Sequence, residues 1–531
     1  MAKGTKGSGA EVLPSDAEPV QRMRAADAGN EDMGSEVHRR EVLRIARGGG
    51  VNLAGATFNQ ILKLGITLVL ARLLGRGQAG LYFQAYAFLA LLGIVAAGGF
   101  TQSLTRFVAL HRADGDAARL RGTVRLGLLL SAGAAAALGG VLYALSPWLA
   151  ASAFEDPHMA ALLRLVALSL PATVFTDAAL AATRGFKTMR PYARINLFFE
   201  PSMRIVLTVG LVWAGWGVRG AMVALLVTNV ASSVLSALAL RGLMGPQTVR
   251  ARYSTRELLT FSSLSWGSAI ASNGLLWADT ILLGLYRSPV EVGMYQVATR
   301  LTVLATTFIN PVALAFAPLV ADLYRKGRYE SLQRTYALIT SWIFRLAVPS
   351  LLVLIVFPRE LLGFFGPGFA TGAGVTMLLA IGQTVNAASG PCGYMLVMSG
   401  RPALLMASNT FALVLNLGLN VWLIPRYGIV GAAAAWGTSI ILVNTIRVLA
   451  VRRTLSMWPF DAGVLKGVAA GAVAAAGGWT AATLLDGPSS LLLGGVLIVA
   501  VYFLCLGKLG IGADDRLVLD TMWRRLRPGR T

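Results

Sequence analysis

The sequence predicts an all-α polytopic membrane protein with about fourteen transmembrane helices. Its 531 residues are 55% hydrophobic and 14% charged, whereas soluble domains average ~25% charged residues. Apolar stretches recur from Gly50 to Leu509, and about 20 such residues in a helix cross the hydrocarbon of a bilayer. These observations exclude a soluble-domain fold.

The apolar segments follow one another along the chain, and each is long enough to span a membrane as a helix. Clusters of Gly, Pro or Arg separate them, as is typical of turns. The predicted helices are 50–73, 80–103, 124–146, 160–182, 192–214, 218–240, 258–285, 290–320, 333–357, 373–398, 402–424, 428–450, 463–485 and 488–509.

An internal repeat divides these helices into two sets of six. Pro147, Phe154 and Gly217-Val-Arg-Gly-Ala recur 211 residues later as Pro358, Phe365 and Gly428-Ile-Val-Gly-Ala. Because six is even, both copies enter the membrane in the same direction, a parallel-repeat architecture of transporters that bind substrate between the halves.

The repeat and the composition of the chain ends predict the domain organisation. Residues 1–48 are rich in Gly, Ala and charge and lack the apolar core of a signal peptide, so we expect a disordered tail there. The predicted regions are a disordered cytoplasmic tail (1–48), an N-terminal six-helix bundle (49–245), a C-terminal six-helix bundle (246–455), two additional helices (456–510) and a basic cytoplasmic tail (511–531).

The formal net charge of +22 is distributed unevenly across the predicted membrane. The side shared by the two termini holds 36 of the 47 Lys and Arg residues, and the opposite side holds six. Basic residues accumulate in cytoplasmic loops. We therefore expect both termini to be cytoplasmic, with the excess charge meeting anionic lipid headgroups rather than nucleic acid.

Charged residues inside the apolar segments are the first candidates for function. A charge at the centre of a helix costs about 2.5 to 3.5 kcal/mol even on the insertion scale, so each needs a physical reason. The embedded charges are Lys63, Arg164, Arg204, Arg300, Arg345, Asp177, Glu200 and Asp279.

Two pairs are expected among them, Glu200 with Arg204 one helical turn away and Asp279 with Arg300. Either pair could serve substrate binding or only helix packing. Lys63 and Arg345 have no acid within a turn on their own helix, which favours an anionic ligand or water as their partner. The candidate substrate-binding residues are Asn59, Lys63, Arg204, Asp279, Arg300 and Arg345.

Asp177 and Glu200 are the candidate sites for a coupling ion or proton. Asp177 could equally pair with nearby Arg194. Polar side chains at helical spacing predict inward faces that line a shared cavity. These faces comprise Asn52, Asn59, Lys63 and Thr67; Ser265, Ser268, Ser272 and Asp279; Gln296, Arg300, Thr307 and Asn310; and Asn409, Asn416 and Asn420.

The sequence offers no sign of a cofactor or a metal centre. His38, His111 and His158 are far apart, and Cys392 and Cys505 lie in separate apolar segments, so neither type has the spacing of metal ligands. The phosphate-binding loop Gly-x-x-x-x-Gly-Lys-Ser/Thr does not occur. We therefore expect no cofactor and no direct use of ATP.

Three stretches of the sequence form a recognisable pattern. They are Leu70-Ala-Arg-Leu-Leu-Gly-Arg-Gly-Gln-Ala-Gly-Leu-Tyr with Gly98-Gly-Phe and Thr105-Arg-Phe-Val; Ala278-Asp-Thr-Ile-Leu-Leu-Gly with Val292-Gly-Met-Tyr-Gln-Val-Ala-Thr-Arg; and Tyr427-Gly-Ile-Val-Gly-Ala-Ala. These stretches resemble the polysaccharide transporter family, the Wzx-type flippases for lipid-linked oligosaccharides. The family belongs to the multidrug, oligosaccharidyl-lipid and polysaccharide exporter superfamily.

The resemblance implies a V-shaped pair of bundles that moves a polyprenyl-diphosphate-linked oligosaccharide from the inner to the outer leaflet by alternating access. It implies a bacterial cytoplasmic membrane, a lipid-linked glycan as substrate, contact with membrane lipids, and glycan polymerases and glycosyltransferases as further partners. The two extra helices resemble those of the lipid II flippase branch.

Two other functions stay open. A multidrug or cation antiporter of the same superfamily would favour an acidic cavity and twelve helices. A membrane glycan polymerase would need a sizeable outer loop with catalytic carboxylates, whereas the predicted outer loops hold only Glu155, Asp156, Glu291, Glu360 and Asp486. We expect a transporter and not an enzyme.

Overall fold

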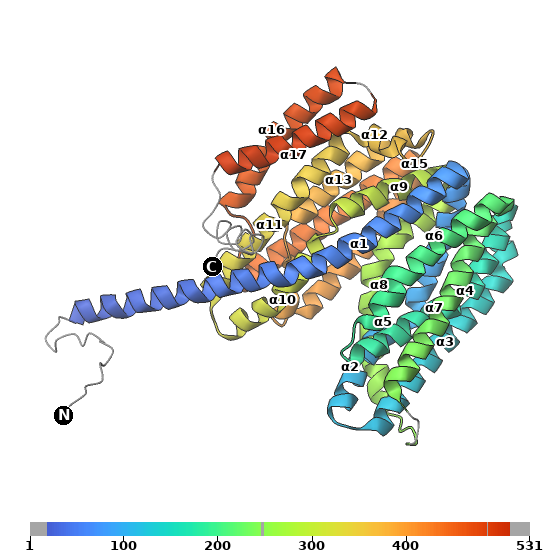
Figure 1. The fold of residues 1–531 in the computed structure, drawn as a ribbon, viewed down its shortest axis with the longest axis horizontal. Helices are drawn as coiled ribbons and strands as arrows, with labels where there is room; N and C mark the ends of the chain where they lie inside the picture. The colour runs from blue at the N-terminus through green and yellow to red at the C-terminus, as the bar shows by residue number, and fades with distance from the viewer. Residues whose placement is uncertain (1–18, 246–248, 486, 510–531) are drawn as a thin grey trace, which may run out of the picture.

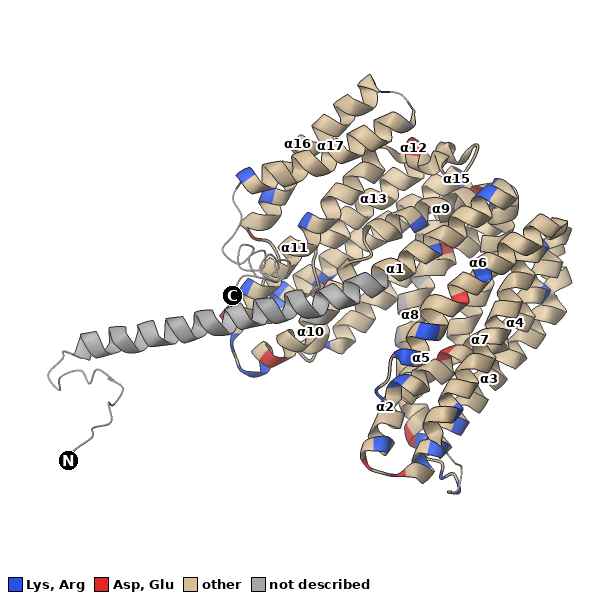
Figure 2. Ribbon diagram, viewed as in Figure 1, with Lys and Arg blue, Asp and Glu red and all other residues tan. Residues whose placement is uncertain are grey.

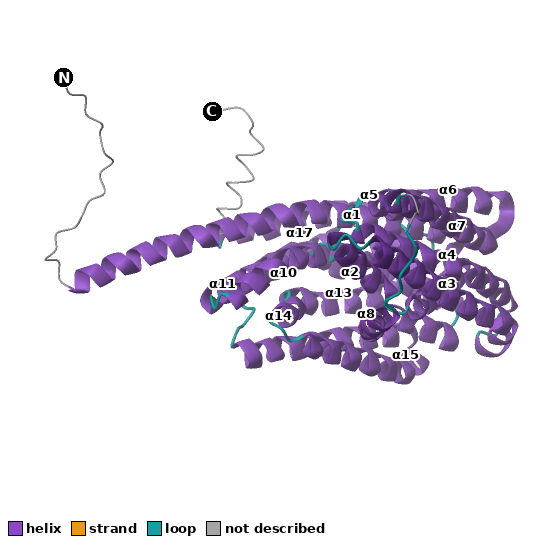
Figure 3. Cartoon of the chain, turned by 90° about the horizontal axis from the view of Figure 1, so that it is seen from below, coloured by secondary structure: helices purple, strands orange, loops and turns teal. Residues whose placement is uncertain are grey.

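Every element in the described part of the chain is a helix, which confirms the all-α class (Figure 3). The computed structural model describes residues 19–245, 249–485 and 487–509. The helices of the N-terminal half are α1 (Pro19–Ala97), α2 (Phe100–Ala113), α3 (Ala117–Trp148), α4 (Pro157–Gly185), α5 (Arg190–Tyr192), α6 (Glu200–Leu211) and α7 (Gly217–Met244). Three π-helical segments, Leu149–Ala153, Ala193–Phe199 and Val212–Trp216, continue α3, α5 and α6.

The helices of the C-terminal half and the two appended helices follow along the chain. They are α8 (Thr255–Tyr286), α9 (Pro289–Ala305), α10 (Ile309–Arg325), α11 (Tyr329–Val356), α12 (Pro358–Gly363), the 3-10 helix Phe369–Gly372, α13 (Ala373–Ala388), α14 (Cys392–Met398), α15 (Pro402–Leu455), α16 (Ala462–Leu484) and α17 (Pro488–Lys508). The sequence predicts disorder in residues 1–48. In residues 19–48 the structure instead has the start of α1, and residues 1–18 lie outside the described residues.

By length and apolar composition, eight helices of the described chain can cross a membrane, or up to ten if two bent pairs each count as one span. Some of these helices contain a sharp break: Gly75 in α1 has φ 70° and Gly428 in α15 has φ 56°. Only glycine adopts such angles readily. The predicted segments 50–73 and 80–103, and likewise 402–424 and 428–450, meet at these breaks. The number fourteen stays a prediction.

Two of the predicted helices are interrupted near a proline. The segment 290–320 is divided into α9 and α10, which are bent by 42°, and 373–398 is divided into α13 and α14. Pro311 and Pro391 have no N–H to donate to the carbonyl four residues earlier, so each break lies just upstream of or at the proline.

The helices form two groups, α2–α7 and α9–α17, which diverge toward the lower edge of Figure 1. They meet where α1 and α9 pack closely. A Cβ on Gly80 would lie 1.7 Å from the carbonyl oxygen of Pro289, and one on Gly293 would lie 2.4 Å from that of Arg76. Gly80 and Gly293, like Arg76 and Pro289, are 213 residues apart. The contact is thus reciprocal, as parallel repeats would produce.

Candidate functional site

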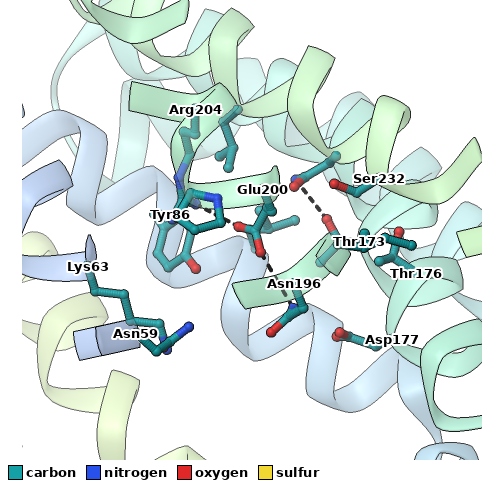
Figure 4. Close-up of a pocket in the computed structure, with 15 residues that line it drawn as sticks. Asn59, Lys63, Tyr86, Thr173, Thr176, Asp177, Asn196, Glu200, Arg204 and Ser232 are labelled. Carbon is teal, nitrogen blue, oxygen red and sulfur yellow. Dashed lines mark hydrogen bonds and ion pairs between the residues drawn. The ribbon is translucent and has the colours of Figure 1, made fainter. Parts of the chain in front are cut away.

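A first cavity of about 200 Å³ lies within the N-terminal half, between α1, α4, α6 and α7 (Figure 4). Its lining combines charged and polar side chains with a few apolar ones. The lining residues are Asn59, Lys63, Tyr86, Leu89, Thr173, Thr176, Asp177, Ile195, Asn196, Glu200, Pro201, Arg204, Leu225, Asn229 and Ser232.

The predicted pair of Glu200 and Arg204 is confirmed and forms one wall of this cavity. The guanidinium lies 3.5 Å from the carboxylate, at positions i and i+4 of α6. Arg204 is 7% exposed, and its guanidinium lies 5.8 Å from the ring centre of Tyr86. The Asn196 amide donates to the second carboxylate oxygen at 3.5 Å. The charge of Glu200 is therefore balanced by Arg204 within the N-terminal half.

Asp177 also faces the cavity, and its side chain is exposed there. Among the described residues it has no hydrogen-bond or ion-pair partner, so the suggested pair with Arg194 does not form. Nearby, Asn229 donates to the Thr173 hydroxyl at 2.9 Å. Within the described ranges, the cavity thus has one carboxylate in an ion pair, Glu200, and one without a partner, Asp177.

A second, larger cavity of about 800 Å³ lies mainly in the C-terminal half. The helices α1, α5, α8, α9, α10, α13, α14 and α15 contribute side chains to it. Its lining residues are Asn59, Gln60, Lys63, Tyr192, Leu197, Leu276, Val303, Thr306, Thr307, Ile309, Asn310, Pro311, Ala313, Leu314, Gln383, Asn386, Gly390, Pro391, Cys392, Gly393, Tyr394, Asn444 and Arg447.

A chain of amides runs along the wall of this second cavity. Asn444 donates to Asn386 at 3.0 Å, and Asn386 donates to Gln383 at 2.8 Å. At its edge Arg447 donates to the hydroxyl of Ser408 at 3.0 Å and to the amide oxygen of Asn409. No Asp or Glu is among the described residues that line this cavity.

Asn59 and Lys63 line both cavities. They are one turn apart on α1 and project from it toward the first cavity in Figure 4. The Lys63 ammonium has no hydrogen-bond or ion-pair partner among the described residues, and the side chain is exposed to the cavities. An unpaired charge inside the bilayer is costly, and no described residue pairs with the Lys63 ammonium.

The predicted pair of Asp279 with Arg300 is wrong. Asp279 is 2% exposed and accepts hydrogen bonds from the Tyr295 hydroxyl and, at 2.7 Å, from the backbone N–H of Thr280. The Arg300 guanidinium lies 5.0 Å from the ring centre of Trp277. Neither residue lines the two cavities. From the sequence, only residues of opposite charge were considered as partners of Asp279, and so the hydroxyl of Tyr295 was not considered.

Arg345 lies away from both cavities. Its guanidinium donates to the carbonyl oxygen of Gly463 at 3.1 Å, so it connects α11 to the appended helix α16. A Cβ on Gly463 would lie 2.2 Å from this guanidinium. The position indicates a packing contact between the C-terminal half and the appended helices.

The predicted polar faces are only partly in the cavities. Thr307 and Asn310 line the second cavity, but Asn416 and Asn420 are fully buried and hydrogen-bond to each other at 2.9 Å. Thr67 is also buried and donates to the carbonyl of Lys63. The side chains of Asn52, Ser268 and Ser272 lie outside the described residues. Helical spacing identified the polar faces, but it could not tell a cavity from an interhelical contact.

Sequence reasoning missed the polar residues of α13 and of the C-terminal part of α15 that line the second cavity. Gln383, Asn386 and Asn444 are single amides in apolar segments, and only tertiary packing brings them together. Arg447 is three residues from the end of the predicted segment 428–450 and thus has the position of a cytoplasmic basic residue. The i, i+3 spacing of Gln383 and Asn386 was an available signal. Within the described ranges, no three His, Cys, Asp or Glu side chains are arranged as metal ligands.

Comparison with known families gives two matches. The sequence model described as polysaccharide biosynthesis protein matches residues 45–324, which is more than half of the chain. The MatE model matches residues 266–422. A curated relative from Haloferax volcanii, named "Probable low-salt glycan biosynthesis flippase Agl15", is 29% identical over 36% of this chain and 41% of its own length. The chain therefore spans about two fifths of the length of this relative.

Solved structures share the fold at low sequence identity. The lipid II flippase MurJ in an inward closed conformation matches with a TM-score of 0.69 and 14% identity, over 86% of this chain and 97% of its own. An inward-facing MATE family multidrug resistance transporter of the MOP superfamily matches with a TM-score of 0.66 and 16% identity, over 77% and 98% of the two chains. These likenesses show a common fold of two helical halves.

Proposed function

The chain belongs to the polysaccharide biosynthesis protein family, as its sequence predicts, and from this premise we propose that it is a membrane transporter that flips a polyprenyl-diphosphate-linked oligosaccharide. The observation that carries the proposal is the position of Lys63, a cation on α1 that lines both cavities and has no hydrogen-bond or ion-pair partner among the described residues. A diphosphate is an anion that such a cation can bind. The names of the relative and of the structural neighbour, both flippases, support the same class of cargo.

The lining of each cavity suggests which part of the cargo binds there. The diphosphate binds beside Lys63, where Asn59 adds a donor. The sugar binds along the amides of the second cavity, because amides offer both donors and acceptors to hydroxyl groups. Arg447 supplies the second cation of that cavity.

Transport proceeds by alternating access from the inner to the outer leaflet of the cytoplasmic membrane, with both termini cytoplasmic. The uneven distribution of basic residues supports this orientation,. Asp177 is the candidate site for a coupling proton or cation, because it is the carboxylate of the first cavity that lacks a partner among the described residues. Glu200 is less suited, since Arg204 balances its charge. Glycosyltransferases that build the cargo and a polymerase that consumes it are the proposed partners.

The test is flipping by the Lys63→Met variant. The full chain is reconstituted in liposomes with a fluorescent short-chain polyprenyl-diphosphate disaccharide, and movement between leaflets is followed by chemical quenching of the outer leaflet. We expect at least a tenfold slower rate for Lys63→Met, the size of a lost hydrogen bond to a charged group. Lys63→Arg should keep most of the rate, and Lys508→Met, an exposed lysine at the end of α17, is the matched control.

Unchanged flipping by Lys63→Met would refute the site, and no flipping by the unmodified protein would refute the cargo. The second candidate function is a multidrug or cation antiporter. The match of the MatE model to residues 266–422 and the unpaired Asp177 favour it. Uptake of a lipophilic cation such as ethidium that is lost in Asp177→Asn, with no flipping of the glycolipid probe, would decide for this alternative.

A further inference from the structure

A third cavity, of about 580 Å³, lies at the end of the N-terminal half that the charge distribution predicts to be cytoplasmic. It is separate from the two cavities of the proposed transport site and shares no lining residue with them. Its lining residues are Arg121, Val124, Arg125, Leu128, Phe175, Ala237, Leu240, Arg241, Met244, Val249, Arg250 and Ala251. Figure 2 shows Lys and Arg positions gathered at this end of the bundle. The volume lies within the ~300–1,000 Å³ of small-molecule sites.

Four arginines line this cavity, and no Asp or Glu is among its described lining residues. Arg125, Arg241 and Arg250 are exposed and have no hydrogen-bond or ion-pair partner in the described part of the chain. The carboxylate of Asp116, which begins α3, is instead 3.3 Å from Arg119. Among the described lining residues, therefore, no carboxylate offsets the charge of Arg125, Arg241 and Arg250.

Contacts within the chain fix one wall of the cavity. Arg121 is 8% exposed and donates to the carbonyl oxygen of Val249 at 2.8 Å. The backbone N–H of Arg252 donates to the carbonyl of Ala118 at 2.9 Å, and a Cβ on Gly122 would lie 1.9 Å from the carbonyl oxygen of Arg252. These contacts hold residues 249–252, which precede α8, against the first turns of α3.

The remaining walls are apolar, and their arrangement suits a lipid. On α3, Val124 and Leu128 alternate with Arg121 and Arg125 at spacings of three and four, so cations and apolar groups share one face. Phe175, Leu240 and Met244 complete the wall. Free phosphate would gain nothing from such a wall, whereas the glycerol and upper acyl carbons of a lipid would bury apolar surface there.

We propose that this arginine cavity, defined by the residues given above, binds the phosphate headgroup of an anionic membrane lipid. Guanidinium groups bind phosphate oxygens through paired, charge-assisted hydrogen bonds, and basic pockets between transmembrane helices at the cytoplasmic side suit such headgroups. The proposal does not depend on the cargo of the transport site. Because the cavity joins α3 and α7 to the segment before α8, a bound lipid would also fix the connection between the two halves.

The experiment measures the apparent Tm of the full chain in dodecyl maltoside micelles during titration with phosphatidylglycerol. We expect a saturable rise in Tm that phosphatidylcholine and inorganic phosphate do not reproduce. The triple variant Arg125→Gln, Arg241→Gln, Arg250→Gln should raise the half-saturating lipid concentration about tenfold or more, as expected when hydrogen bonds to a charged group are lost. The matched control removes three exposed arginines outside the cavity: Arg256→Gln, Arg325→Gln, Arg453→Gln.

An equal loss of lipid response in the control variant would overturn the proposal, since it would show diffuse attraction. Unchanged lipid binding by the triple variant would also overturn it. An equal rise in Tm with inorganic phosphate would overturn the assignment to a lipid. If the triple variant does not fold, the single variants Arg125→Gln and Arg241→Gln decide in the same titration, because both side chains are exposed and have no partner among the residues that the structure describes.

Discussion

The two halves of the molecule have glycines at equivalent positions of the backbone, but the side chains that line their cavities differ. Gly217 and Gly428 are repeat equivalents with φ of 52° and 56°, and Gly80 and Gly293 form a reciprocal contact. The charged residues are not repeated, because the positions equivalent to Glu200, Arg204 and Asp177 hold Phe411, Leu415 and Ala388. The N-terminal cavity is ionic, and the C-terminal cavity is lined by amides and Arg447.

This difference suggests that duplication supplied the scaffold and that later substitutions separated the tasks. A symmetric pair of ionic cavities would have placed twice as many charges in the bilayer, at a cost of a few kcal/mol each.

The largest effect is expected from Gly80→Ala, which disrupts the close contact between α1 and α9. The new Cβ would lie 1.7 Å from the carbonyl oxygen of Pro289, and a backbone atom cannot yield as a side chain can. We expect loss of most folded protein, measured by the monodisperse peak in size-exclusion chromatography. Gly65→Ala is the matched control because nothing lies within 4 Å of its Cβ. Equal yields of the two variants would contradict the close approach of α1 and α9.

Arg204→Met tests the ionic half and should have the next largest effect. The change leaves Glu200 without its ion pair, and removal of one partner of a buried pair costs ~3–5 kcal/mol. The cost should be at or below this range, because the Glu200 side chain is 23% exposed. We expect a lower apparent Tm and slow flipping. The double variant Glu200→Gln, Arg204→Met should regain much of the Tm; if it is no more stable than the single variant, the pair does not carry the effect.

The smallest effect is expected from Asn386→Leu in the amide half. The change removes the central amide between Asn444 and Gln383, and neutral hydrogen bonds contribute ~0.5–1.5 kcal/mol each. The KM for the glycosylated probe should rise about three- to tenfold, whereas the KM for polyprenyl diphosphate without sugar should stay unchanged. Thr384→Val, whose hydroxyl bonds within α13, is the control. An equal effect on both probes would place the sugar elsewhere.

A large part of the fold could be predicted from the sequence, because the bilayer allows little else. Long apolar segments in water-free surroundings satisfy their backbone hydrogen bonds as helices, so the all-α class could be predicted from the residues. The family could be predicted from the stretches that resemble it. The pair of Glu200 and Arg204 also followed, since four residues on one helix fix its geometry. The breaks near Pro311 and Pro391 also have a local cause, because proline has no backbone N–H to donate within a helix.

What the tertiary structure alone decided is which embedded residues share a space. Asp279 accepts from Tyr295 of the next helix, Arg345 contacts α16, and Asn416 and Asn420 are buried against each other. Helix periodicity gives the face on which a side chain lies, but not the neighbour that this face meets. Lys63 was identified from the sequence as an embedded cation without an acid nearby; that it lies between an ionic cavity and an amide-lined one depends on how the two halves pack around α1.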